Sequence, residues 1–377
     1  MKKVGIVTFS RTNNYGARLQ SYAMYHIFKD LGYDVEIVNL MYPKKFLKYV
    51  LGRIANKSTS LNEWLKKYVI TFKMFKYTNS INLTRTLVTG STSKMVDFIN
   101  KRNYDAVVCG SDEIWCSRQK EIAPPSIYFL PKELKAKRIS FSPSANGNHK
   151  YTDEEIKWLK STFQSFSFLG VRDKMTDNLL KKCGNNNGKV MFDPTLYYEF
   201  KDVELPKELN KKTDKKKIGF AFARPDNGLP KRLLESIKEI YGDEAEVYSI
   251  FNEIKGTKFL PISPAQFACI FKKFDIVYTN LFHATIFSLK CNTPVYGMDT
   301  FQKYANRESK IEDLLNRLEL KEFFYSDIHK DKYNFTELID NSKEILDGRG
   351  SYDFSRNVAI AKDDLTNDVN RIKEIIG

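Results

Sequence analysis

The chain lacks the cysteine and histidine patterns of metal-binding and disulfide-rich proteins. It has five cysteines and four histidines among 377 residues, and no two cysteines form a C-x-x-C pair. A structural zinc site, a disulfide framework and a polyhistidine metal site are therefore not expected. We predict no metal and no cofactor, and the scattered cysteines fit a reducing compartment.

Long hydrophobic runs are also missing. No run approaches the roughly 18 apolar residues of a membrane-spanning helix. The N-terminal Met1-Lys-Lys-Val-Gly-Ile-Val-Thr-Phe9 has only a short apolar run that leads into polar residues, so it reads as a first strand rather than a signal peptide. We expect a cytoplasmic protein, with the inner face of the membrane as a further place of action.

Glycine-rich nucleotide loops are missing too. The loop after the first expected strand, Arg11–Ala17, matches neither G-x-G-x-x-G nor G-x-x-x-x-G-K-[ST]. Neither a dinucleotide nor a P-loop nucleotide is indicated.

The charge, by contrast, is large, with a formal net value of +15. An anionic membrane surface, a phosphorylated substrate and nucleic acid are partners that such a charge attracts, and a merely lysine-rich soluble surface is the alternative. The sequence shows no zinc-finger or RRM signature, so we predict no nucleic-acid partner.

The length suggests two domains, and a hydrophobic content of 42% is ample for two cores. Short apolar runs alternate with segments of helical periodicity, first to about residue 200 and again from residue 218. This predicts an α/β protein of two Rossmann-like domains facing a cleft. We expect an N-terminal domain at 1–203, a lysine-dense linker at 204–217, a C-terminal domain at 218–350 and a helical region at 351–377.

The segment 43–76 differs from the rest of the first domain. It has nine basic residues and a single acid, Glu63, with Phe46, Trp64, Phe72 and Phe75 interleaved. A basic helix with aromatics fits a membrane surface. The alternative is an inserted helical hairpin whose aromatics pack on the domain and whose lysines are solvated.

Polar residues directly follow four expected strands, and they are the candidates for a site at the carboxyl ends of the sheets. They are Asn13-Asn14-Tyr15-Gly16, Ser111-Asp112, Arg224 and His283. Asp112 could act as a general base, hold sugar hydroxyls, or cap a helix beginning near Glu113. Arg224 could grip a carboxylate or phosphate, or form a surface ion pair. His283 stands where a strand gives way to a helix, so it could contact an anion there or only pack its ring.

Six ordered blocks of the sequence resemble the polysaccharide pyruvyl transferase family. They are Asn14-Tyr-Gly-Ala-x-Leu-Gln20, Tyr104-Asp to Gly110-Ser-Asp-Glu-Ile-Trp115, Val171-Arg-Asp173, Asp193-Pro-Thr-Leu196, 275–288 around His283, and Asn306-Arg-Glu-Ser-Lys-Ile-Glu-Asp-Leu-Leu315. Four positions depart from the family pattern: Arg18, Glu113, Leu281 and Ala284.

This resemblance implies a fold like that of GT-B glycosyltransferases. It also implies transfer of a pyruvyl (enolpyruvyl) group from phosphoenolpyruvate to hydroxyls of a sugar or a lipid-linked oligosaccharide, usually forming a ketal. The expected catalytic residues are His283 and Asp112. The expected donor-binding residues are Arg224, Phe282, Ala284 and Thr285, and the acceptor-binding ones are Asn14, Tyr15, Gly16 and Ser111.

Two other functions stay open at this point. One is a nucleotide-sugar glycosyltransferase of the same architecture. The other is a non-catalytic partner of a polysaccharide assembly pathway that binds an anionic membrane through the segment 43–76.

Overall fold

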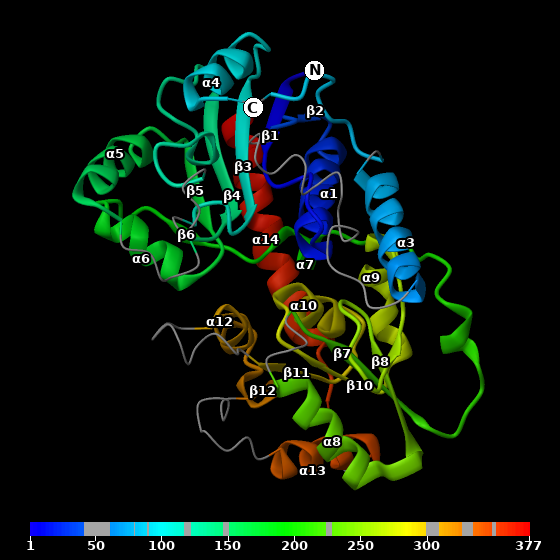
Figure 1. Ribbon diagram of the computed structural model, residues 1–377. Helices are drawn as coiled ribbons and strands as arrows, with labels where there is room; N and C mark the ends of the chain where they lie inside the picture. Colours follow the sequence, from blue (N-terminus) through cyan, green and yellow to red (C-terminus); the bar gives the residue numbers. More distant parts are fainter. Residues whose placement is uncertain are drawn as a thin grey trace. The chain divides into compact units, whose positions relative to one another are not determined.

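The computed structural model describes residues 1–40, 61–78, 80–88, 90–116, 122–145, 151–223, 228–298, 309–325, 335–348 and 352–377. These residues form two compact units, one from Met1–Glu199 with Ala361–Gly377 and one from Phe200–Ile360. Each unit has its own parallel sheet with helices packed beside it (Figure 1). The prediction of an α/β protein with two Rossmann-like domains is confirmed.

The first unit is built on a six-stranded sheet in the order β2-β1-β3-β4-β5-β6. Its strands are β1 (Lys3–Val7), β2 (Asp34–Ile37), β3 (Ala106–Asp112), β4 (Lys137–Pro143), β5 (Phe168–Val171) and β6 (Lys189–Val190). Its main helices are α1 (Tyr15–Asp30), α3 (Leu61–Thr78), α4 (Thr92–Asn100), α5 (Asp153–Phe163), α6 (Lys174–Lys182) and α7 (Pro194–Tyr197). The β1–α1–β2 crossover joins parallel neighbours.

Local sequence signals set several helix ends in this unit. Thr152 and Glu155 form a capping box at the start of α5, with the Thr152 N–H donating to Glu155 Oε2 at 2.7 Å. Gly32 has a φ of 89°, which a residue with a Cβ rarely adopts, and it follows the end of α1.

The core of the first unit anchors the loop that follows β3. Trp115 is fully buried, and its indole N–H donates to the Tyr128 carbonyl at 2.9 Å. Its ring stacks on Phe129 with centroids 5.5 Å apart. A buried aromatic with a satisfied N–H holds its backbone firmly. The turn after β3 is therefore fixed directly behind Asp112.

The second unit has a six-stranded parallel sheet in the order β12-β11-β10-β7-β8-β9. Its strands are β7 (Lys216–Ala221), β8 (Ala245–Ser249), β9 (Lys258–Phe259), β10 (Ile276–Thr279), β11 (Val295–Met298) and β12 (Phe324–Tyr325). Its main helices are α8 (Leu229–Tyr241), α9 (Pro264–Cys269), α10 (Phe282–Lys290), α12 (Lys310–Arg317) and α13 (Thr336–Leu346). The segment 204–217 lies in this unit and contains the 3-10 turn Lys207–Asn210 and the start of β7.

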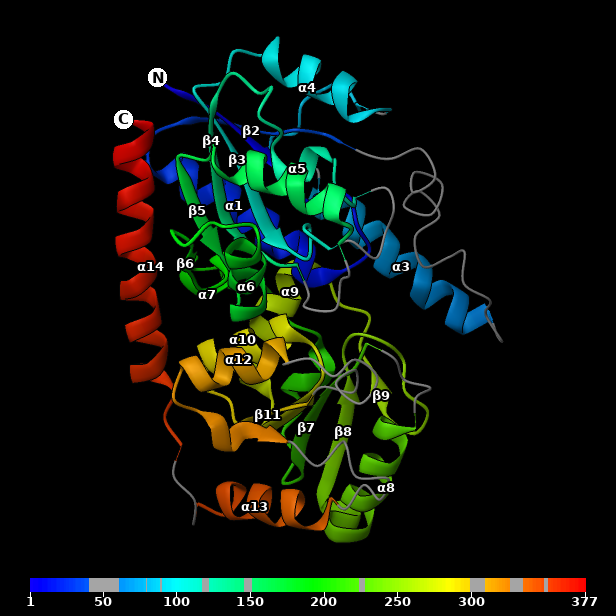
Figure 2. The same cartoon turned by 90° about the vertical axis from the view of Figure 1, so that its left-hand side faces the viewer.

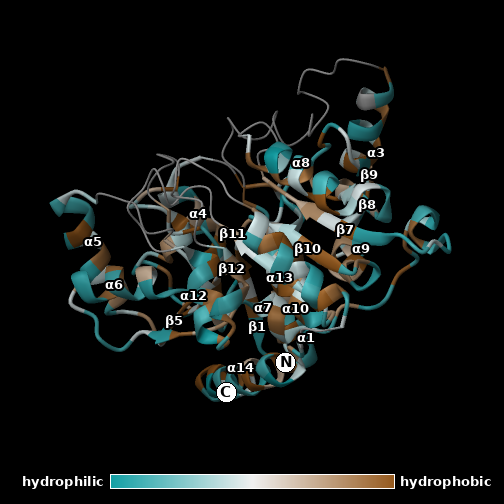
Figure 3. Cartoon of the chain, turned by 90° about the horizontal axis from the view of Figure 1, so that it is seen from below, coloured by the Kyte–Doolittle hydropathy of each residue, from teal (hydrophilic) through white to brown (hydrophobic). Residues whose placement is uncertain are grey.

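The last helix, α14 (Ser355–Ile376), begins in the second unit and ends in the first. Figure 3 shows both hydrophobic and hydrophilic residues along it. Lys2 Nζ donates to the Ile376 carbonyl at 2.5 Å, and Lys137 Nζ donates to the Ile375 carbonyl at 2.7 Å. Cations at a helix C-terminus satisfy carbonyls that have no partner within the helix. These bonds hold the end of α14 beside the N-terminus of the chain (Figure 2).

Part of the basic segment lies outside the described residues, namely 43–60, and the rest belongs to α3. The buried Arg18 donates to the carbonyl of Met74 on α3 and to that of Thr12 in the loop after β1. This explains the departure from the family pattern at position 18, because the arginine ties α3 to the first unit. None of the described helices has the length and apolar composition to cross a membrane.

Candidate functional site

Asn14, Tyr15 and Gly16 lie where the chain passes from β1 into α1. Asn14 is the N-cap of α1, and its Oδ1 accepts hydrogen bonds from the N–H of Gly16 at 2.8 Å and of Ala17 at 3.3 Å. Tyr15 and Gly16 are buried, whereas Asn14 is exposed. Asn14 is therefore the member of this trio whose side chain lies at the surface of the sheet edge.

Ser111, at the end of β3, is joined to the start of α1 by hydrogen bonds. Its N–H donates to Gln20 Oε1 at 2.9 Å, and Gln20 Nε2 donates to Thr8 Oγ1 at 2.8 Å. The structure thus brings the predicted acceptor-binding residues together on one edge of the first sheet. Ser111 is itself fully buried, and its Oγ donates to Asp193 Oδ2 at 2.7 Å.

A buried arginine supports this edge, and its role was not predicted from the sequence. Arg172 follows β5, is 2% exposed, and places Nη1 3.3 Å from Asp193 Oδ2. Burial by itself lowers the pKa of the Arg172 guanidinium, but the charges of Asp193, Asp112 and Asp173 outweigh it and raise that pKa. Arg172 is therefore a permanent cation behind Ser111 and Asp112. The V-R-D and D-P-T-L blocks were the sequence signal that could have identified Arg172 and Asp193.

Asp112 is the last residue of β3 and is partly exposed. Its φ is 79°, and its Oδ1 accepts the N–H of Glu113 at 2.8 Å. Residues 113–116 form a turn, so the interpretation of Asp112 as the cap of a helix near Glu113 is wrong. The carboxylate lies at the carboxyl edge of the first sheet, where open α/β folds bind ligands.

The predicted donor-binding residues Phe282, Ala284 and Thr285 lie with His283 in the first turn of α10. The helix begins at Phe282, so His283 is its second residue. The N-cap, Leu281, has no side chain that could accept from the first-turn N–H groups. With its partial positive charge, this end of α10 favours an anion.

Short hydrogen bonds fix the backbone around this turn. Thr279 Oγ1 donates to the Ala221 carbonyl at 2.7 Å, and the Leu281 N–H donates to Thr279 Oγ1 at 3.0 Å. Asn280 Oδ1 accepts the N–H of Ala223 at 2.8 Å, which holds the end of β7 beside the end of β10. Arg224, the next residue, lies outside the described residues.

Lys310, a cation of this unit, lies close to the α10 turn. Lys310 Nζ is 5.9 Å from the centroid of the Phe282 ring. Lys310 begins α12, and its preceding residue Ser309 caps that helix. The sequence block 306–315 contains Lys310, but its pattern alone does not indicate that the lysine approaches Phe282.

The two groups of residues belong to different units: Asp112 with Asn14–Gly16 and Ser111 in the first, and His283 with Phe282–Thr285 in the second. That they face one cleft stays a prediction. Within the described residues, no cluster of three or more His, Cys, Asp or Glu side chains is arranged to hold a metal ion.

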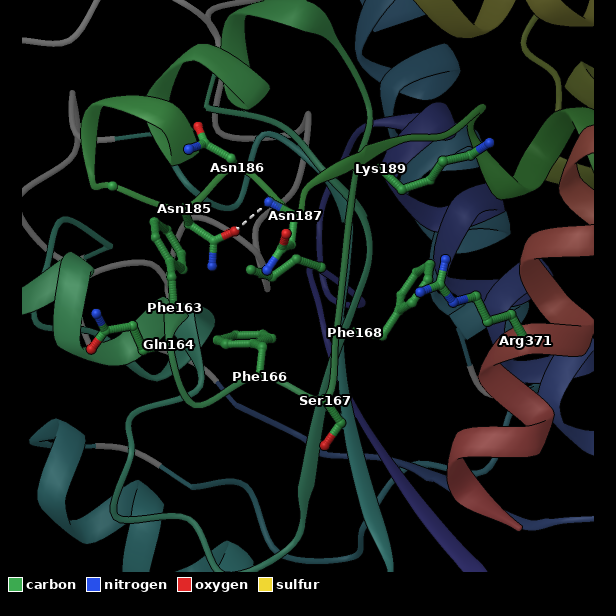
Figure 4. Close-up of a pocket in the computed structure, with 12 residues that line it drawn as sticks. Phe163, Gln164, Phe166, Ser167, Phe168, Asn185, Asn186, Asn187, Lys189 and Arg371 are labelled. Atoms are coloured by element: carbon green, nitrogen blue, oxygen red, sulfur yellow. Dashed lines mark hydrogen bonds between the residues drawn. The ribbon is translucent and has the colours of Figure 1, made fainter.

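A pocket of about 670 Å³ lies beside the amino ends of β5 and β6 in the first sheet, at the end opposite to the carboxyl edge. It is lined by aromatic rings, amides and two cations, among them Phe166, Asn187, Lys189 and Arg371 (Figure 4). No predicted site residue lines it.

Solved structures that resemble this chain share its architecture at low sequence identity. The UGT73P12 structure from Glycyrrhiza uralensis is 10% identical, with a TM-score of 0.55 over 100% of this chain and 96% of that one. The UDP-GlcNAc 2-epimerase of Methanocaldococcus jannaschii is 14% identical, with a TM-score of 0.51 over 92% and 93% of the two chains. The spinosyn rhamnosyltransferase SpnG, complexed with thymidine diphosphate, is 8% identical, with a TM-score of 0.50 over 100% of both chains. These likenesses show a GT-B-like fold.

Sequence comparison identifies the family. No curated protein matches the chain significantly. The profile of the polysaccharide pyruvyl transferase family matches residues 14–300, which include β3, the Arg172 and Asp193 blocks and the whole of α10. The chain therefore belongs to the polysaccharide pyruvyl transferase family.

Proposed function

We propose that the protein transfers the pyruvyl group of phosphoenolpyruvate to sugar hydroxyls and forms a pyruvate ketal. One sugar hydroxyl adds to C2 of phosphoenolpyruvate while C3 gains a proton, and a second hydroxyl then displaces phosphate at C2. One phosphoenolpyruvate and one diol thus give one ketal and one phosphate. The observation that carries this proposal is the family match across residues 14–300, which includes His283 and the start of α10.

The α10 turn suits the donor, which carries a phosphate and a carboxylate. Helix N-terminal N–H groups bind such anions, and arginine grips them in a bidentate manner. We assign donor binding to Phe282, Ala284, Thr285 and Arg224. Lys310, beside Phe282, adds positive charge to the same region.

His283 is assigned as the acid that protonates C3, or as a contact to the departing phosphate. A histidine titrates near neutral pH and can deliver a proton in the transition state. No cofactor or metal has a part in these steps.

Asp112 is assigned to the acceptor, whose hydroxyl it orients or deprotonates. The turn after β3 holds this carboxylate in place, and the buried Arg172 guanidinium interacts electrostatically with it. Asn14, Tyr15, Gly16 and Ser111 complete the proposed acceptor-binding edge. We further propose that the acceptor is a cell-surface polysaccharide or its lipid-linked precursor, and that the protein acts in the cytoplasm at an anionic membrane surface.

The experiment is incubation of the full chain with phosphoenolpyruvate and lipid-linked oligosaccharides, followed by phosphate release and product mass. We expect phosphate and ketal in equal amounts, with both formed far more slowly by His283→Ala. A product without phosphate release would contradict the proposal.

A nucleotide-sugar glycosyltransferase is the second candidate, favoured by the GT-B-like fold. Thermal shift with phosphoenolpyruvate, UDP-sugars and GDP-sugars separates the two. Stabilisation by phosphoenolpyruvate alone supports pyruvyl transfer, and stabilisation by a nucleotide sugar alone supports glycosyl transfer.

A further inference from the structure

The outer face of α3 exposes an unusual amount of apolar surface. Six of the ten large hydrophobic side chains that are exposed in the described part of the chain lie on this one helix. They are Leu61, Trp64, Leu65, Tyr68, Val69 and Phe72. Single exposed hydrophobic residues are ordinary on protein surfaces, but a contiguous group of them marks an interaction site.

The spacing of these residues places them on one face. Leu61, Leu65, Tyr68 and Phe72 recur every three or four residues, so they form a stripe along the helix. Trp64 stacks on Tyr68 with centroids 5.7 Å apart, which joins its indole to the stripe. Phe72 is 61% exposed and Leu65 is 47% exposed.

The opposite face of α3 is the one that holds it to the first unit. Ile70 and Met74 are each 1% exposed, and the Met74 carbonyl accepts from Arg18. Tyr77 contacts Tyr22 of α1 with ring centroids 5.1 Å apart. The helix is thus anchored by one apolar face and presents a second one outward. The alternative in which its aromatics pack on the domain is wrong for Trp64 and Phe72.

Positive charge borders the outer stripe. Helical geometry places Lys66, Lys73 and Lys76 along one border, and Lys67 lies on the other side. Apolar residues with a tryptophan and a tyrosine, flanked by lysines, are the composition of helices that lie in a membrane interface. A second copy of the chain would bring the same positive charge against these lysines, whereas anionic lipid complements them.

We infer that the outer face of α3 docks on an anionic lipid bilayer, with Leu61, Leu65, Tyr68 and Phe72 in the interfacial layer and the lysines on lipid headgroups. This extends the membrane contact of the proposed function by naming the surface that makes it. It needs no pyruvyl transfer, so the docking and the reaction can fail separately.

The test is co-sedimentation of the full chain with vesicles of phosphatidylglycerol and phosphatidylcholine in equal parts, and with phosphatidylcholine alone. We expect binding to the mixed vesicles that weakens with salt and is much lower on phosphatidylcholine. The Leu65→Asn/Phe72→Asn variant should bind at least about tenfold more weakly. The matched control, Val203→Asn/Ile360→Asn, removes two exposed apolar side chains elsewhere and should bind like the wild type.

A second readout uses the unaltered helix and does not depend on the fold of the double variant. Lipids brominated on their acyl chains should quench part of the tryptophan fluorescence of the wild type, and Trp64→Phe should abolish that quenching. Trp115 is fully buried, and Trp158 packs against Phe129 at the core of the first unit, so neither is expected to respond. Equal binding of wild type and both double variants, absence of vesicle binding, or quenching that survives Trp64→Phe would each overturn the inference. So would a wild-type dimer that the Leu65→Asn/Phe72→Asn variant dissociates without any effect of lipid.

Discussion

The carboxyl edges of the two sheets are built in contrasting ways. At the edge of the first sheet, Ser111 and the buried Arg172 converge on the same Asp193 oxygen, and Asp112 stands beside them. At the edge of the second sheet, a helix begins without a side-chain cap and carries His283 in its first turn. The first edge presents a fixed carboxylate, and the second presents N–H groups with partial positive charge.

This difference matches the two partners of the proposed reaction. A sugar hydroxyl needs an oxygen acceptor that is held in place, because a loose base loses orientation. Phosphoenolpyruvate is an anion and needs donors and cations. The comparison therefore supports the proposal that the first unit binds the acceptor and the second unit binds the donor. Three substitutions at the two edges can break or sharpen that proposal, and a fourth concerns stability elsewhere.

The largest effect is expected at the second edge, for His283→Ala. Loss of the proposed acid should lower kcat by about 10²–10⁴-fold, while the melting temperature stays close to that of the wild type. Phosphate release from phosphoenolpyruvate measures this. His283→Gln is the matched control for size and polarity, and it should be similarly inactive. A His283→Ala enzyme with wild-type kcat would remove His283 from the reaction.

The next largest effect is expected at the first edge, for Arg172→Met. The substitution leaves Asp193 buried without its cation, so the free energy of unfolding should fall by about 3–5 kcal/mol. Urea unfolding measures this, with Arg172→Lys as a control that keeps the charge and should lose less. Unchanged stability of Arg172→Met would show that the pair does not support this edge.

A smaller, selective effect is expected for Arg224→Gln. If Arg224 holds the donor, KM for phosphoenolpyruvate should rise roughly 10–100-fold while KM for the acceptor changes little. Arg356→Gln removes the same charge from an exposed position of the second unit and should leave both values unchanged. If both substitutions changed KM for phosphoenolpyruvate equally, Arg224 would act only through the overall charge and would not bind the donor directly.

The smallest effect concerns stability away from either edge. Burial raises the pKa of Asp368 on α14 to about 6, against the opposing charge of Lys189, whose Nζ is 3.8 Å away. The folded protein therefore binds this proton more tightly than the unfolded chain, and stability should fall as pH rises from about 4 to about 6. Asp368→Asn should remove this fall of stability with pH. It should also raise the free energy of unfolding at neutral pH by about 1–2 kcal/mol. Urea unfolding of both proteins across this range tests the prediction, and identical slopes would contradict it.

Much of the fold follows from the sequence because its strands are short apolar runs separated by long periodic helices. The start of α5, for example, is marked in the sequence by a capping box. Elements that the sequence pattern does not predict include the helices α4, α7 and α13 and the two-residue strands β9 and β12. The pairing of a short strand depends on neighbouring strands that are far away in the sequence, and the local hydrophobic periodicity contains no information about them.

The candidate site is only partly predictable for the same reason. Positions after strands identify Asp112 and His283, because chain order places them at a sheet edge. The sequence pattern does not show that Arg172 meets Asp193, or that Lys310 approaches Phe282, because these contacts join separate segments. The spacing of apolar residues in the sequence indicates the outer stripe of α3. It does not indicate whether this stripe faces solvent or the core, because that depends on which of the two apolar faces of the helix contacts α1.

The most direct test of the central claim is the reaction of phosphoenolpyruvate with a lipid-linked oligosaccharide in deuterated water, followed by mass spectrometry of the product. The proposed protonation at C3 predicts a pyruvate ketal whose methyl group carries a single deuterium, formed with an equal amount of phosphate. A product without deuterium in that group, or a product formed only when a nucleotide sugar is supplied, would contradict the account.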